Sequence, residues 1–177
     1  MQVWNFESVS LEISDQSHNV SLDSKGPDET QAIGRVLGEI ACPGDVFLLV
    51  GDLGAGKTCL TQGILFGLGS DDFARSPTFV LVAQYPGLLT LYHMDLYRLD
   101  SFEEVLDLGL DEYIFGDGVS VVEWADKAAE AFPESHMLIE IEQTGEDNRR
   151  LKFTANGERY EEILKKIKTR DGIDSHP

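Results

Sequence analysis

Residues 46–58 of this chain read VFLLVGDLGAGKT, a short apolar run followed directly by a glycine-rich loop. The run at 46–50 is fully apolar and rich in branched side chains, which is typical of a buried parallel strand. In the loop, Gly51 and Gly56 permit the tight turn that points successive backbone N–H groups inward. The stretch therefore predicts a strand, a phosphate-binding turn and a helix in immediate succession.

The last two residues of the loop add the other groups that nucleotide phosphates need. Lys57 provides a cation for the β and γ phosphates, and Thr58 a hydroxyl ligand for magnesium. The helix expected after the loop, with its apolar face from Leu60 to Leu68, adds the positive end of its dipole. The pattern predicts binding of a nucleotide with Mg²⁺.

Outward from this loop, strand and helix patterns alternate. A helix begins at Pro27–Thr30, with acids at the positive end of its dipole, and ends before Cys42–Asp45. Further strands are predicted at 79–85, 88–97, 119–122, 137–141 and 151–155, and helices at 101–109, 126–132 and 160–168. The first two of these strands form a hairpin around Pro86–Gly87. The interleaving predicts an α/β fold, a P-loop NTPase-like mixed β-sheet flanked by helices, in a single domain.

The 177 residues have the length of one domain. Three segments are expected: an N-terminal edge segment of uncertain role at 1–26, the P-loop ATPase domain at 27–168, and a disordered tail at 169–177. Leu11 and Ile13 alternate with polar residues as edge strands do, whereas Ser14–Asn19 reads as polar punctuation.

Two carboxylates occupy positions that a magnesium nucleotide site requires. Glu123 follows the buried strand 119–122, so it should lie at the strand tip and bind the metal or its water. Asp95 belongs to a polar cluster at 93–98, where strand alternation places it on the same face as His93. Asp95 could assist the metal or position a water. A structural hydrogen-bond network explains this cluster equally well.

A second candidate segment lies between the helix after the loop and the predicted hairpin. Ser76, Pro77, Thr78 and Phe79 stand where P-loop proteins often place a switch that responds to the γ phosphate. The residue pattern alone favours a plain loop that leads into the strand.

Composition restricts the partners. The net charge of −18 opposes direct binding of DNA or RNA, although an acidic surface that only aids solubility explains the charge as well. The longest apolar run is too short to cross a membrane, and Met1–Asn5 does not resemble a secretory signal, so a cytoplasmic protein is expected. Cys42 and Cys59 form no disulfide framework or metal pattern and are expected to be small buried residues.

The motifs occur in an order that resembles one family. The segments are Gly51–Thr58, Ser76–Phe79, His93–Arg98, Gly109–Tyr113 and Val122–Trp124. Together they resemble the TsaE (YjeE) family, most clearly over Asp28–Trp124. The resemblance implies a bacterial ATPase with ATP and Mg²⁺ as cofactors, needed to form threonylcarbamoyladenosine at position 37 of tRNAs reading ANN codons. It also implies two partners, TsaD, which transfers the threonylcarbamoyl group, and TsaB, which scaffolds TsaD, with tRNA reached only through the complex.

The resemblance also implies roles for individual residues. The catalytic residues would be Lys57, Asp95 and Glu123, with Thr58 and Glu123 as magnesium ligands. The nucleotide-binding residues would be Asp52, Gly54, Ala55, Gly56, Lys57, Thr58 and Cys59, and the switch Ser76, Pro77 and Thr78. Cys59 replaces a second hydroxyl usual in the family, but its backbone N–H remains available to the α phosphate. The adenine pocket is expected around Asp28–Thr30.

Other P-loop functions are alternatives. A small-molecule kinase needs an acceptor site and usually an arginine-bearing lid, but the adjacent Arg149 and Arg150 fall near a late predicted hairpin. A GTPase switch normally carries an Asn/Thr-Lys-x-Asp element after a strand, which this sequence lacks. A nucleotide-dependent assembly factor without a direct catalytic role remains an alternative.

Overall fold

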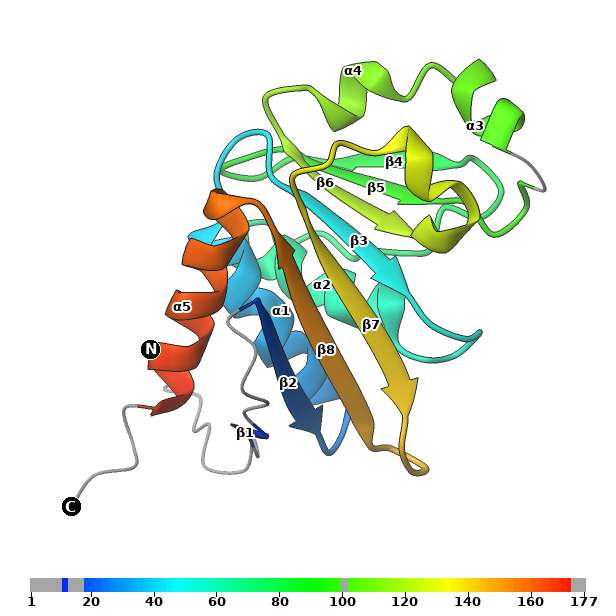
Figure 1. Ribbon diagram of the computed structural model, residues 1–177. Helices are drawn as coiled ribbons and strands as arrows, with labels where there is room; N and C mark the ends of the chain where they lie inside the picture. The colour runs from blue at the N-terminus through cyan, green and yellow to red at the C-terminus, as the bar shows by residue number, and fades with distance from the viewer. Residues whose placement is uncertain (1–10, 13–17, 100–101, 173–177) are drawn as a thin grey trace.

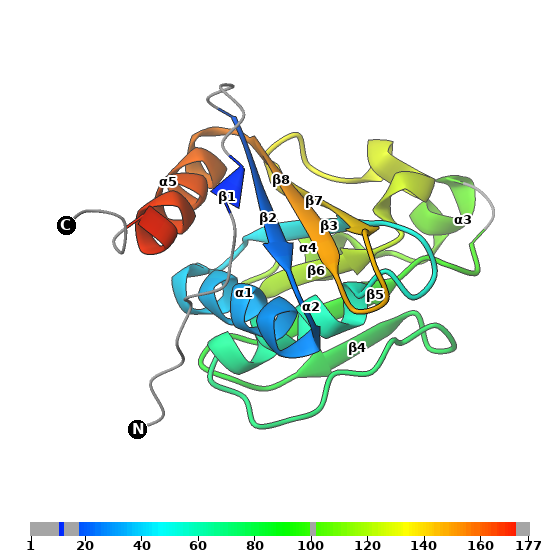
Figure 2. The same cartoon turned by 90° about the horizontal axis from the view of Figure 1, so that it is seen from below.

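The apolar run before the loop forms a central strand of a mixed sheet. A computed structural model of the chain describes residues 11–12, 18–99 and 102–172 (Figures 1 and 2). Its strands are β1 (Leu11–Glu12), β2 (Asn19–Ser24), β3 (Val46–Val50), β4 (Val82–Tyr85), β5 (Leu91–Asp95), β6 (Val119–Glu123), β7 (His136–Gln143) and β8 (Arg149–Asn156). Their order in the sheet is β1-β2-β8-β7-β3-β6-β5-β4. β3 pairs in parallel with β6 and β7, and β5 with β6, whereas the remaining neighbours are antiparallel.

Helices cover both faces of this sheet. They are α1 (Pro27–Ile40), α2 (Lys57–Gly67), α3 (Phe102–Asp107), α4 (Asp111–Ile114), the 3₁₀ helix η1 (Ala125–Ala131) and α5 (Glu158–Gly172). Phe47 and Leu49 of β3 pack into the core shared with α1, α2 and α5. Val46 and Leu48 pack into a second core with α3, α4 and η1. Figure 1 shows α3 and α4 at the top of the view, away from α5. The predicted α/β class and mixed sheet are confirmed.

Glycines bring α1 and α2 into backbone contact. A Cβ atom built on Gly34 would lie 2.3 Å from the Leu60 carbonyl oxygen, and one on Gly63 would lie 2.1 Å from the Gln31 carbonyl oxygen. Because α2 starts at Lys57, this contact fixes the helix that follows the glycine-rich loop against α1.

The hairpin is confirmed, but its strands are shorter than predicted. β4 begins at Val82 rather than at 79, because the N–H groups of Val80 and Leu81 both donate to the Pro77 carbonyl and form a turn. Leu81 takes a left-handed conformation at φ 66°. β5 covers only Leu91–Asp95. Just after the hairpin turn, the N–H of Leu88 donates to the carbonyl of Leu68, the residue that follows α2.

Several other boundaries differ from prediction. β2 starts at Asn19 and pairs with β8, with Val20 and Leu22 buried, so the chain is already part of the sheet before residue 27. The helix at 126–132 is the 3₁₀ helix η1, and α4 was not predicted. α5 continues to Gly172, into the stretch expected to be a tail. Ile13 and residues 173–177 lie outside the described residues.

The prediction that both cysteines are buried is wrong for Cys42. Cys42 is exposed in the turn between α1 and β3, where its backbone N–H donates to Asp45 (2.8 Å). Cys59 is half-buried in α2. Among the described helices, none combines the length and apolar character that crossing a membrane requires.

Candidate functional site

The glycine-rich loop, residues 51–58, connects the carboxyl end of β3 to the first turn of α2. Gly56 precedes α2 in a left-handed conformation (φ 110°), which favours glycine. Gly51 lies against β7, where a Cβ atom would be 2.4 Å from the Ile141 carbonyl oxygen. The two glycines singled out in the sequence are thus required by conformation and by space.

Lys57 points back into its own loop. Its Nζ donates to the carbonyl oxygens of Gly51 (2.5 Å) and Asp52 (3.0 Å) and lies 3.7 Å from the ring centroid of Trp124. Burial lowers the pKa of Lys57, while the nearby carboxylates, Glu123 first, oppose that effect. The backbone of Trp124 is left-handed at φ 61°, a conformation that is costly for a residue other than glycine. In this conformation the indole lies beside the Lys57 ammonium.

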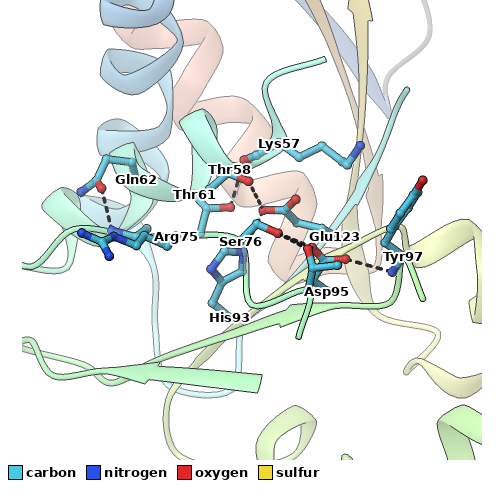
Figure 3. Close-up of polar contacts among 12 residues, drawn as sticks. Lys57, Thr58, Thr61, Gln62, Arg75, Ser76, His93, Asp95, Tyr97 and Glu123 are labelled. Atoms are coloured by element: carbon cyan, nitrogen blue, oxygen red, sulfur yellow. Dashed lines mark hydrogen bonds and ion pairs between the residues drawn. The ribbon is translucent and has the colours of Figure 1, made fainter. Parts of the chain in front are cut away.

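The hydroxyl of Thr58 joins the loop to the end of β6. Its Oγ1 donates to Glu123 Oε1 (2.8 Å), and the same oxygen lies 2.8 Å from Nε2 of His93 (Figure 3). Glu123 is only 3% exposed, so this carboxylate is removed from bulk water. A buried carboxylate is stable when it accepts hydrogen bonds of this kind.

Asp95 ends β5 opposite Glu123 and holds the predicted switch segment. In the parallel pairing of β5 with β6, Asp95 and Glu123 are in register. Oδ2 of Asp95 accepts hydrogen bonds from the hydroxyls of Ser76 and Thr78 (2.6 Å for Thr78), and Oδ1 accepts one from the Tyr97 N–H (2.9 Å) (Figure 3). The structure therefore contains the hydrogen-bond network that the sequence left as one alternative.

One cavity of about 420 Å³ collects most of the predicted residues. The predicted residues that line it are Gly54, Gly56, Lys57, Thr58, Cys59, Ser76, Thr78, Asp95 and Glu123. Three predicted residues do not line it: Ala55 and Pro77 are buried, and Asp52 is exposed beside it. The cavity lies where the parallel strands β3, β5 and β6 end, the usual place for ligands in α/β sheets.

The adenine region proposed at Asp28–Thr30 lies close to the loop but is not part of this lining. Cys59 Sγ is 3.4 Å from the Pro27 carbonyl oxygen, so the start of α1 neighbours the first turn of α2. Thr30 is buried and bonded to Ser24 (2.8 Å). Assignment of the base to this region stays a prediction.

Arg149 is a residue at the loop that sequence reasoning did not assign to the site. Its Nε donates to the Ala55 carbonyl (2.8 Å) and one terminal nitrogen approaches the Gly54 carbonyl (3.4 Å). The other terminal nitrogen binds carbonyls of the β7–β8 turn, including that of Asn148 (2.8 Å). No local pattern marks this residue, because the β7–β8 hairpin brings it to the loop from 94 residues away.

The oxygen donors present fit a magnesium ion. Across the described ranges, no three His, Cys, Asp or Glu side chains gather as a metal cluster. Mg²⁺ does not require such a cluster, because it commonly takes one or two protein oxygens and completes its shell with phosphate and water. Thr58 Oγ1 and the Glu123 carboxylate, 2.8 Å apart, are two such hard donors beside the cavity.

The mixed sheet, the loop after β3 and the acids that end β5 and β6 define a protein with a P-loop NTPase-like fold. The profile of a family described as "Threonylcarbamoyl adenosine biosynthesis protein TsaE" matches residues 24–151. The chain therefore belongs to the TsaE family.

Individual relatives agree with this assignment. The TsaE protein of Bacillus subtilis (strain 168), named for tRNA threonylcarbamoyladenosine biosynthesis, is 47% identical over 148 residues, which are 83% of this chain and 92% of the relative. The protein of the same name from Treponema pallidum is 42% identical over 72% of this chain and 95% of its own length. The crystal structure of Bacillus YdiB superposes with a TM-score of 0.76 at 39% identity, covering 92% of this chain and 98% of YdiB.

Proposed function

We propose that this chain binds ATP with Mg²⁺ at the loop 51–58 and hydrolyses it slowly. In this proposal, hydrolysis supports threonylcarbamoyl transfer to adenosine 37 of tRNAs reading ANN codons, carried out by a TsaB–TsaD complex. The name shared by the family and its relatives supports the pathway. The observation that carries the nucleotide chemistry is the convergence of Lys57, Thr58, Asp95 and Glu123 on one cavity.

Each of these side chains has a distinct proposed role. The Lys57 ammonium would leave the loop carbonyls for the β and γ phosphate oxygens, a stronger charge-assisted contact. Thr58 and Glu123 would hold the magnesium ion, which when bound neutralises phosphate charge. Asp95 would orient the attacking water, since its carboxylate is buried, in register with Glu123 and hydrogen-bonded on both oxygens.

The switch segment is proposed to respond to the nucleotide. Ser76 and Thr78 are bound to the same oxygen of Asp95, Oδ2, so a nucleotide or water that engages this oxygen would compete with the contacts that hold the segment. The next two residues, Phe79 and Val80, are 81% and 69% exposed. Exposed apolar residues beside a nucleotide-responsive segment support docking of a protein partner that depends on ATP.

The charge of the chain supports an indirect route to tRNA. At −18 the chain repels a polyanion, and two cations at the loop, Lys57 and Arg149, are bonded to backbone carbonyls. Binding of RNA requires cations that neutralise phosphates and release counterions. The partner complex would therefore hold the tRNA.

A kinase function is less well supported. Arg149, which could have belonged to an arginine-bearing lid, instead supports the loop from behind through carbonyl contacts. An assembly factor without catalysis would share the nucleotide site but not require Asp95.

The deciding experiment is reconstitution of tRNA modification. TsaB, TsaD, tRNA and the threonylcarbamoyl donor are incubated with wild-type chain, with Thr58→Ala, or without the chain, and modified adenosine is quantified by mass spectrometry. We expect sustained modification only with wild type. Equal modification without the chain would refute the function.

Docking is measured in parallel by pull-down of the TsaB–TsaD pair with and without ATP and Mg²⁺, and we expect capture to depend on nucleotide. Filter binding of the isolated chain to tRNA at physiological salt should stay near background. Tight, salt-sensitive tRNA binding by the isolated chain would overturn the partner model.

A further inference from the structure

His93 is a fully buried polar residue for which the proposed chemistry has no role. It lies on β5, two residues before Asp95, with no exposed surface. Its Nε2 is 2.8 Å from Glu123 Oε1, whereas Nδ1 is buried without a hydrogen-bond partner among the described residues. A buried polar group with one partner at a candidate metal ligand calls for a physical explanation.

The two nitrogens of the ring determine which tautomer fits. With hydrogen on Nε2, the ring donates to the Glu123 carboxylate and Nδ1 is only an acceptor. With hydrogen on Nδ1, a buried N–H would have no acceptor and Nε2 would face a carboxylate oxygen as a second acceptor. The geometry therefore favours the Nε2–H tautomer, which makes His93 a donor to Glu123.

The sheet holds the ring behind the carboxylate. His93 is in register with Val121, two residues before Glu123 on the adjacent parallel strand, so the two side chains lie on the same face. The ring of Tyr85, on the other neighbouring strand, lies 6.4 Å from the imidazole. His93 thus has little freedom to turn away.

The two carboxylate oxygens of Glu123 differ in their hydrogen-bond partners. Oε1 accepts from both Thr58 and His93, at 2.8 Å each, whereas none of the described residues donates a hydrogen bond to Oε2. If Thr58 turns its hydroxyl to a metal ion, His93 is the remaining protein donor to Oε1 within the part of the chain described.

We propose that His93 is a positioning residue that orients the Glu123 carboxylate and thereby sets the affinity for magnesium, without touching ion or nucleotide. The inference rests on the proposed function, because it takes Glu123 to be a magnesium ligand. Groups that hydrogen-bond to metal ligands typically change metal affinity about 10–100-fold when removed.

Three variants separate the hydrogen bond from packing. His93→Leu removes the donor at similar volume, and His93→Gln keeps an N–H donor near the position of Nε2. Met94→Leu is the control, because Met94 is equally buried on the same strand but packs into the opposite core. His93→Asn, whose amide is too short to reach Glu123, replaces His93→Leu if that variant does not fold.

The first measurement is equilibrium binding of a non-hydrolysable ATP analogue across a Mg²⁺ titration. For His93→Leu we expect metal-free affinity within about twofold of wild type, but a Mg²⁺ requirement at least about 10-fold higher. His93→Gln should stay within about threefold of wild type, and Met94→Leu should match it. An unchanged Mg²⁺ requirement in folded His93→Leu overturns the inference and leaves the proposed function intact. Absence of Mg²⁺–nucleotide binding by wild type would instead refute the proposed function.

The second measurement needs neither metal nor nucleotide. In ¹⁵N-histidine NMR spectra of the free protein, we expect one histidine with a slowly exchanging, downfield proton on Nε2 that disappears in His93→Gln. That proton should move upfield in Glu123→Ala. A proton on Nδ1, or no response to Glu123→Ala, would contradict the hydrogen bond on which the inference depends.

Discussion

Replacement of Gly63 by alanine should destabilise the protein through a steric conflict between α1 and α2. A Cβ atom there would lie 2.1 Å from the Gln31 carbonyl oxygen, about 1.3 Å short of the 3.4 Å at which ordinary contact begins. Since the atom it meets belongs to the backbone, the helices must move apart. Overpacking typically costs about 1–3 kcal/mol, and this case belongs at the upper end. Because alanine favours the helix over glycine by about 1 kcal/mol, the net decrease in the free energy of unfolding should be about 2 kcal/mol.

Thermal unfolding followed by circular dichroism measures this effect. For a chain of this size, about 2 kcal/mol lowers Tm by roughly 4–8 °C. Gly26→Ala is the matched control, because nothing lies within 4 Å of its Cβ position and its backbone is extended. Because Gly26 is the N-cap of α1, where glycine is preferred to alanine, the control should cost at most about 1 kcal/mol, clearly less than Gly63→Ala. A wild-type Tm for Gly63→Ala would show that the two helices are not in the close contact described.

The remaining predictions concern the site and the core. Lys57→Ala should weaken ATP binding, measured by calorimetry, about 10–100-fold, as expected for a lost charge-assisted contact. Thr58→Ala should keep metal-free ATP binding but lose hydrolysis. Normal turnover in Thr58→Ala would exclude a role for this hydroxyl at the metal. Asp95→Asn should reduce hydrolysis in a phosphate-release assay without lowering Tm, and unchanged turnover would assign Asp95 to a structural network alone. ATP should bind much more tightly than GTP, so equal affinities would contradict an adenine-specific site. Burial raises the pKa of the Tyr160 phenol to about 12, from 10.0, so the phenol ionises at lower pH in the unfolded chain than in the folded one. The free energy of unfolding, measured with urea, should therefore fall by up to about 2–3 kcal/mol between about pH 10 and 12. Tyr160→Phe has no phenol to ionise and should lose correspondingly less stability over this pH range.

The fold could be predicted from the sequence wherever the apolar pattern within a single segment was enough to indicate a strand or a helix. β3 is apolar along its length and lies between two parallel neighbours, as its composition indicates. β2 was missed because its first residue, Asn19, reads as punctuation, and only pairing with β8 makes Val20 and Leu22 a buried face. The start of β4 was misplaced because the Pro77 turn depends on hydroxyl contacts with a distant strand.

The site shows the same division between local and distant information. The loop could be recognised because its groups are contiguous, and Glu123 because it ends a buried strand. Arg149 could not be recognised as part of the site, because its contacts with Gly54 and Ala55 form only when the β7–β8 hairpin packs next to the loop. His93 was visible as a polar residue on a strand, but its partner depends on the register between β5 and β6.

The net charge of the chain is a further physical reason to expect that nucleotide binds together with magnesium. A net charge of −18 repels a free nucleotide triphosphate as well as tRNA, and the buried carboxylates Asp95 and Glu123 add local negative charge. Burial already lowers the pKa of Lys57, which is the one cation among the described residues that line the cavity. Binding is then stronger when the ligand arrives with part of its charge neutralised, which a magnesium complex provides. The orientation of Glu123 therefore matters more here than it would in a basic protein, because the ion must offset the field of the whole chain as well as the phosphates.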